Sequence, residues 1–154
     1  MTQMGHRNPG TVGAVFDNDT VYAPIILDGA HCDYAAARIA YKIKKDKLFL
    51  ISDAAFLGRQ VKEFNSELLD AKLVDGFYRN MNGNLAGTAI SMAEAVQNAL
   101  KHLNSPLDET IRMATLNVAK AIKMENVLGN IDAGYPASFI CFNDDFTEYK
   151  SMVL

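Results

Sequence analysis

Two short apolar runs in the first third of the chain predict buried strands. Residues 21–27 (VYAPIIL) end at an Asp-Gly pair, and residues 47–51 (KLFLI) end at a Ser-Asp pair. Short apolar runs bounded by turn residues are typical of strands that are buried on both faces. After a possible helix cap at Asp33, apolar residues between the two runs recur at helical spacing: Ala36, Ile39, Ala40 and Ile43. The order strand, helix, strand predicts a βαβ unit with parallel strands.

Three helices are expected in the second half of the chain. Ser91 and Glu94 form a capping box ahead of a helix. Its apolar face consists of Met92, Ala95, Val96, Ala99, Leu100 and Leu103. A second helix is expected to have Ser105 as its cap and Pro106 at its first position. A third, short helix is expected to be capped by Asn117.

The remaining segments predict hairpins and strands. Residues 56–83 are irregular, and the pairs Asp75-Gly76 and Asn82-Gly83 flank the segment FYRNM as hairpin turns flank a strand. Residues 137–142 and the final YKSMVL are expected to be strands that need partners. The fold class is therefore α/β, and the element order fits the last part of a barrel followed by a small sheet.

Composition and charge exclude several functional classes. The chain has 154 residues, 49% of them hydrophobic, and a net charge of −3 without a marked basic run, which argues against nucleic-acid binding. No segment approaches the roughly 20 apolar residues that a membrane helix needs, and the first ten residues are too polar for a signal peptide, so we expect a cytoplasmic protein. Cys32 and Cys141 lack metal-binding spacing and are expected to be buried free thiols.

Candidate catalytic residues follow the two predicted parallel strands. Catalytic groups gather at the carboxyl ends of parallel strands, so His31 and Asp53 are expected to share one site. Asp53 can equally be a turn or capping residue, and His31 can be a histidine packed under a loop. For Asp28, we favour a hydrogen bond to the backbone of its own Asp-Gly turn over a catalytic role.

Two further segments offer possible ligand contacts. Arg7 lies in a Gly- and Pro-containing stretch and can hold an anion through its guanidinium group, or it can be an exposed loop residue without a task. Residues 82–88 (NGNLAGT) can bring backbone groups close to a ligand, although a plain loop is the commoner explanation. The residues by themselves leave both alternatives open.

Taken together, these segments resemble the N-acetylglucosamine-6-phosphate deacetylases of the amidohydrolase superfamily. The resemblance is colinear and extends from Met1 to about Phe142. It rests on HRNPGTVGA (6–14), IILDGAHCDYAAARIA (25–40), LFLISDA (48–54), GNLAGTAISMAEAVQN (83–98), and RMATLNVAKAIKM with LGNIDAG (112–134). The last of these is generic to the superfamily. Departures from the family pattern include Ser52, where threonine is common, and Asn8, where glutamate often stands.

The resemblance implies a (β/α)₈ TIM-type barrel with a small β-sandwich domain. Residues 1–128 would be the C-terminal part of the barrel, and residues 129–154 would be strands that return to the sandwich. The expected reaction is the metal-dependent hydrolysis of N-acetylglucosamine 6-phosphate to glucosamine 6-phosphate and acetate. The expected protein is a homodimer that is longer than this chain.

The resemblance also assigns roles to residues. Asp53 matches the aspartate that acts as general base on a metal-bound water and then as acid toward the amine. His31 matches a histidine that contacts the sugar phosphate, and Arg7 matches an arginine that holds the phosphate, often across the dimer interface. The loop that closes over the substrate corresponds to Leu85, Ala86 and Gly87.

The divalent metal, zinc or a similar ion, would be held mainly by ligands that precede this chain in the family, with Asp53 as the one possible ligand here. We therefore expect the chain alone to bind no metal and to be inactive. Two alternatives remain: another amidohydrolase with a different amide or cyclic-amide substrate, and a non-catalytic fragment that binds sugar phosphates or serves assembly. Arg7 and His31 together favour a sugar phosphate.

Overall fold

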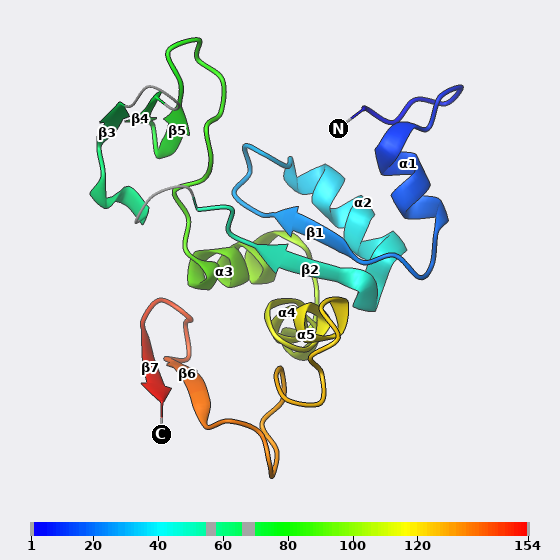
Figure 1. The fold of residues 1–154 in the computed structure, drawn as a ribbon, viewed down its shortest axis with the longest axis vertical. Coiled ribbons are helices and arrows are strands. Elements are labelled where there is room, and N and C mark those ends of the chain that lie inside the picture. Colours follow the sequence, from blue (N-terminus) through cyan, green and yellow to red (C-terminus); the bar gives the residue numbers. More distant parts are fainter. Residues whose placement is uncertain (1, 55–57, 66–69, 154) are drawn as a thin grey trace.

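The structure, a computed structural model, describes residues 2–54, 58–65 and 70–153 (Figure 1). The helices are α1 (Gly10–Asp17), α2 (Tyr34–Lys44), α3 (Met92–His102), α4 (Leu107–Ala114) and α5 (Leu116–Ala121), with short 3₁₀ turns at Lys45–Lys47 and Gly58–Gln60. The strands are β1 (Ala23–Ile26), β2 (Leu48–Ile51), β3 (Glu63–Asn65), β4 (Asp70–Val74), β5 (Phe77–Arg79), β6 (Ser138–Phe142) and β7 (Tyr149–Val153). No helix among the described residues is both long and apolar enough to cross a bilayer.

The predicted βαβ unit is present and confirms the α/β class. β1 and β2 pair in parallel, from Ala23 opposite Leu48 to Ile26 opposite Ile51. Parallel neighbours need a crossover connection, and α2 provides it. Asp33 caps α2 as expected, because its side chain accepts a hydrogen bond of 2.7 Å from the backbone N–H of Ala35.

The buried face of α2 differs from the one suggested by the apolar spacing. Ala37, Ala40 and Lys44 are the buried residues of this helix. Ile39 and Ile43 are instead 54% and 45% exposed. The apolar spacing therefore identified the helix but not the face that it presents to the core.

A buried lysine joins α2 to α1, a helix that the apolar pattern did not predict. The Nζ of Lys44 donates hydrogen bonds to the carbonyl oxygens of Val15, at 3.0 Å, and Asn18, at 2.6 Å. Carbonyl groups at the C-terminal end of a helix lack intrahelical donors and carry partial negative charge, which suits an ammonium group. Lys44 thus fastens the end of α1 to α2 with its charge, in addition to the apolar packing of Val15 and Phe16 against the core.

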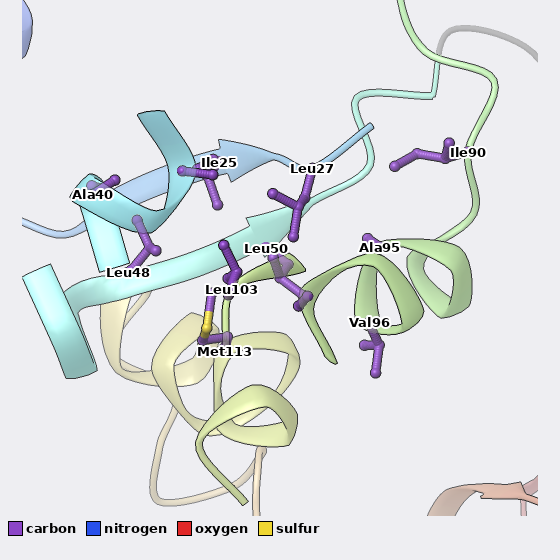
Figure 2. Close-up of a cluster of buried hydrophobic side chains, with 13 residues drawn as sticks. Ile25, Leu27, Ala40, Leu48, Leu50, Ile90, Ala95, Val96, Leu103 and Met113 are labelled. Carbon is purple, nitrogen blue, oxygen red and sulfur yellow. The ribbon is translucent and has the colours of Figure 1, made fainter. Parts of the chain in front are cut away.

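The core lies between the β1–β2 pair and helices α3 and α4 (Figure 2). The buried side chains include Ile25, Leu27, Leu48, Leu50, Ile90, Val96, Leu103 and Met113. α3 begins with the predicted capping box: the Ser91 hydroxyl accepts from the N–H of Glu94, and the Glu94 carboxylate accepts from the N–H of Ser91. Most of the predicted apolar face of α3 is buried, which confirms the periodicity that identified this helix.

The predicted start of α4 is one residue too early and that of α5 is two residues too late, because two side chains have other partners. Pro106 is the N-cap of α4 rather than its first residue, and the Ser105 hydroxyl lies 2.6 Å from the hydroxyl of Thr110. Asn117 lies inside α5 and donates a 2.9 Å hydrogen bond to the carbonyl of Leu48. Asn117 therefore ties α5 to the start of β2 instead of capping its own helix.

Two smaller antiparallel sheets complete the described chain. β3, β4 and β5 form one sheet, with the predicted turn at Asp75-Gly76 between β4 and β5, and residues 55–57 and 66–69 of the predicted irregular segment lie outside the described residues. β6 and β7 pair with each other as a hairpin. Cys141 in β6 is exposed and Cys32 is only half-buried, so the expectation of two buried thiols is wrong for Cys141 and only partly met for Cys32.

Truncating a core leucine should cost far more stability than truncating a half-exposed one. Leu50 is 1% exposed and Leu107 is 49% exposed. We expect Leu50→Ala to lower the free energy of unfolding by about 2–5 kcal/mol, because it leaves a cavity against α3 and α4, and Leu107→Ala to lower it by less than about 1 kcal/mol. Urea denaturation followed by circular dichroism measures both. Equal losses would contradict this placement of the core.

Candidate active site

His31 and Asp53 lie in two loops that leave the same edge of the β1–β2 pair. Ile26 pairs with Ile51 at the carboxyl end of the parallel ladder, and the loops that carry the two residues begin directly after it. Figure 1 shows both loops leaving the arrowheads of β1 and β2 on the side of α3. The two candidates therefore follow strands that end at the same sheet edge, as the parallel pattern predicted, and a site shared by them stays a prediction.

Asp53 is held in a left-handed backbone conformation that residues other than glycine seldom adopt. Its φ angle is 50°, and the residue is exposed. A left-handed conformation costs an aspartate on the order of 1–3 kcal/mol and persists only where neighbours impose it. Thr88 is that neighbour: its N–H donates to the carbonyl of Asp53 at 3.1 Å, and its buried hydroxyl donates to the carbonyl of Ser52 at 2.5 Å. Thr88 therefore fixes the backbone from which the Asp53 carboxylate projects.

The loop of Leu85, Ala86 and Gly87 is held between the β5 hairpin and Asp53. The N–H of Ala86 donates to the carbonyl of Tyr78 at 3.0 Å, and Leu85 forms an antiparallel bridge with Arg79 in β5. Gly87 has a φ angle of 89°, which glycine adopts without a steric penalty. Since Thr88 follows directly and bonds to Asp53, this loop runs into the Asp53 segment.

His31 is paired with Asp28, a contact that the sequence analysis missed. The Nδ1 of His31 lies 2.7 Å from the Oδ2 of Asp28. The Oδ1 of Asp28 accepts hydrogen bonds from the N–H groups of Ala30, at 2.9 Å, and His31, at 2.8 Å. The expected turn role of Asp28 is thus confirmed, but only one of its oxygens serves it. The spacing of three residues between Asp28 and His31 across a turn is the sequence signal that could have revealed this pair.

The environment keeps Asp28 ionised. Burial by itself raises the pKa of this carboxyl group, but the hydrogen bonds from the His31 side chain and from the N–H groups of Ala30 and His31 outweigh it and hold the pKa below the ordinary value of 3.8. Gly29, with a φ angle of 79°, lets the turn close against the ring of Tyr34, where an added Cβ would lie 2.9 Å from the nearest ring carbon. Asp28 is therefore a buried anion with three donors around it.

Arg7 is not joined to these residues. It is an exposed residue before α1, and within the described residues its guanidinium group has no hydrogen bond or ion pair. Figure 1 shows this N-terminal segment at the amino end of α1, on the far side of α2 from α3. Within one copy of the chain, the structure therefore does not gather Arg7 with Asp53.

The described residues do not form a metal centre. No three histidine, cysteine, aspartate or glutamate side chains of the described chain come together in a way that could hold a metal ion. Asp53 alone offers a carboxylate to a cation, and a single carboxylate does not bind a divalent ion tightly. The divalent ion that the family resemblance implies therefore does not fit the residues of this chain by themselves.

Two contacts beside the site gave no signal in the sequence. The side-chain amide of Asn98 in α3 donates a 2.8 Å hydrogen bond to the carbonyl of Leu27, at the end of β1. Arg59 and Glu94 form an ion pair of 2.5 Å between the turn after Asp53 and the start of α3. In each of these two contacts the partners are far apart in the chain, so only the folded structure identifies them.

Replacing Asp28 should change how stability depends on pH. Because the folded protein lowers the pKa of Asp28, the ionised group stabilises the fold above the unfolded-state pKa near 3.8, and this contribution is lost as pH falls through the lower folded-state pKa. We expect Asp28→Asn to lower the free energy of unfolding by about 1–3 kcal/mol at pH 7 and by less at pH 3. Urea denaturation at both pH values tests this. A gap that is constant or grows on acidification would contradict the assignment.

Three comparisons with known proteins find relatives of this chain. The model of the amidohydrolase family matches residues 24–153. The N-acetylglucosamine-6-phosphate deacetylase of Haemophilus influenzae is 36% identical over 96% of this chain and 39% of its own length, and the N-acetylgalactosamine-6-phosphate deacetylase of a Shewanella species is 37% identical over 94% and 37%.

A crystal structure of N-acetylglucosamine-6-phosphate deacetylase from Pasteurella multocida superimposes with a TM-score of 0.87 at 40% identity, covering 92% of this chain and 38% of that one. The chain thus spans less than two fifths of the length of these three relatives. Because the family model covers most of its length, the chain belongs to the amidohydrolase family.

Proposed function

We propose that the protein hydrolyses the acetamide group of N-acetylglucosamine 6-phosphate, giving glucosamine 6-phosphate and acetate. The observation that carries the proposal is the placement of Asp53, which Thr88 holds in a left-handed conformation at the carboxyl end of β2. His31 leaves the same sheet edge, and the Leu85–Gly87 loop runs into Asp53. The names of the similar proteins support this substrate class.

Asp53 is assigned the proton transfers of the reaction. An exposed, ionised carboxylate accepts a proton from water as the water oxygen attacks the acetyl carbon. The C–N bond then breaks, and Asp53 returns the proton to the departing sugar amine, which leaves acetate and the free amino sugar. One carboxylate can therefore serve as base and then as acid, provided that its backbone is held as Thr88 holds it.

His31 and Arg7 are assigned to the sugar phosphate, and the Leu85–Gly87 loop to closure over the substrate. His31 is suited to this role because its ring is partly exposed at the shared edge while Nδ1 is engaged by Asp28. Arg7 is exposed and separate from Asp53 within one copy. We therefore propose a homodimer, in which Arg7 serves the site of the other copy.

The proposal includes a longer protein with a (β/α)₈ barrel and a small β-sandwich. Residues 1–128 would belong to the barrel, for which the parallel βαβ unit is the support, and residues 129–154 to the sandwich. Large apolar side chains in the second part are exposed, including Ile131 at 84% and Val153 at 80%, which fits surfaces that pack on further chain. Any catalytic metal would take its remaining ligands from outside these residues and would supply Lewis-acid activation.

A second candidate substrate is N-acetylgalactosamine 6-phosphate. The Shewanella relative that bears this name is as similar to the chain as the Haemophilus relative, so identity alone does not separate the two sugars. They differ only in the configuration of one hydroxyl group, and both place the acetamide and the phosphate alike.

Since phosphorylated sugars are retained inside cells, we propose that the enzyme acts in the cytoplasm.

Asp53→Asn should greatly slow turnover by the whole protein. Asparagine tolerates a left-handed backbone, so this variant removes the base without adding backbone strain. We expect kcat for acetate release from N-acetylglucosamine 6-phosphate to fall about 10²–10⁴-fold. Asp46, which precedes β2 at the opposite end of the strand, supplies the matched control Asp46→Asn, whose kcat should be unchanged.

The same assay, with zinc or manganese added, should be run on the 154-residue chain and with the galactosamine epimer and unphosphorylated N-acetylglucosamine. The proposal is supported if turnover is lost in Asp53→Asn but not in the control Asp46→Asn. Hydrolysis of another amide but of neither sugar phosphate would refute the substrate, and turnover by the 154-residue chain itself would refute the need for further ligands.

A further inference from the structure

We infer that Asp28 is a positioning residue that sets the tautomer and direction of the His31 ring, so that Nε2 is the nitrogen offered to the substrate. This inference rests on the proposed function for its catalytic consequence only. The geometry on which it depends is that of one turn, residues 28–31, after β1. The roles already assigned to Asp53 and Arg7 do not depend on this turn.

The Asp28 carboxylate divides its two oxygens between two tasks. Its side chain is completely buried, and Oδ1 is occupied by the N–H groups of Ala30 and His31. These two bonds build the turn and need no imidazole. Oδ2 is left for Nδ1 of His31, at 2.7 Å. A side chain that served the turn alone would not need its second oxygen aligned with the ring.

The charge of Asp28 decides which ring nitrogen carries the proton. An ionised carboxylate only accepts hydrogen bonds, so Nδ1 of His31 must carry a proton to bond to it. In the neutral imidazole Nε2 then has a free lone pair, and in the cation it is a donor. The His31 side chain is 18% exposed, and within the described residues its Nε2 has no hydrogen-bond partner, which leaves this nitrogen for a ligand. Carboxylates that orient histidines in this way affect activity without touching the substrate.

The tautomer can be read in the chain itself. We expect long-range ¹H–¹⁵N spectra, at a pH where the imidazoles are neutral, to show the proton of His31 on Nδ1, with its signals among the three histidines assigned through loss in His31→Gln. In Asp28→Asn, the amide oxygen can keep the two backbone bonds of the turn, so its NH₂ group faces Nδ1 and the proton should move to Nε2. Asp33→Asn, which changes a nearby aspartate that caps α2, is the matched control and should leave the tautomer unchanged.

A His31 proton on Nε2 in the wild-type chain would overturn the inference, and this result needs no variant to fold. An unchanged tautomer in a folded Asp28→Asn chain would overturn it as well.

The catalytic consequence is tested in the whole enzyme by a double-mutant cycle. If Asp28 acts through His31, Asp28→Asn should lower kcat/KM about 10–100-fold in the wild-type background and have little effect once His31 is alanine. Equal losses in both backgrounds would mean that Asp28 only supports the fold, and would refute the positioning role. A whole enzyme that deacetylates neither sugar phosphate would refute the proposed function, while the spectra would still decide the tautomer.

Discussion

The parallel pairing of β1 with β2 is the constraint on which the other features depend. Parallel neighbours cannot be joined by a tight turn, so α2 must cross over between them. The pairing places Leu48 and Leu50 against α3 and α4, where both are almost completely buried. A slip of the β2 register by one residue would turn these leucines away from the core, so burial and register enforce each other. The same register makes the loops of His31 and Asp53 leave one edge.

Side chains from distant elements satisfy the carbonyl groups where this ladder stops. Asn98 donates to Leu27 at the end of β1, Asn117 donates to Leu48 at the start of β2, and Thr88 donates to Ser52 after β2. A buried carbonyl without a donor is costly, so each bond stabilises the fold in which its two partners meet. These bonds also fix the points from which the site loops depart.

The candidate site residues are therefore held by hydrogen bonds within the chain itself. Thr88 fixes the backbone of Asp53. The carboxylate of Asp28, whose pKa is lowered by the hydrogen bonds of its turn and of the His31 side chain, holds the His31 ring. Groups that are held in place need little rearrangement when charge develops during a reaction, which is the principal advantage of a preorganised site. The left-handed conformation of Asp53 is a local cost that the surrounding hydrogen bonds offset.

The sequence by itself determined the local structure. The apolar runs predicted β1 and β2, the Ser91–Glu94 pair predicted the start of α3, and the Asp75-Gly76 turn predicted the β4–β5 hairpin, because each depends on residues that are close in the chain. The expectation that Asp53 and His31 share an edge also followed, since it depends only on parallel strands.

Only the tertiary structure decided which partner each polar side chain has. Asn117 carries a local signal for a helix cap, yet it bonds to Leu48, 69 residues away, and Lys44 bonds to carbonyl groups at the end of α1. Local spacing places Asp28 in its turn and His31 within reach of it, but only the folded structure shows that the second oxygen of Asp28 holds the ring. Hydrogen bonds form between groups that folding brings together, and sequence patterns report helix and strand periods rather than those encounters.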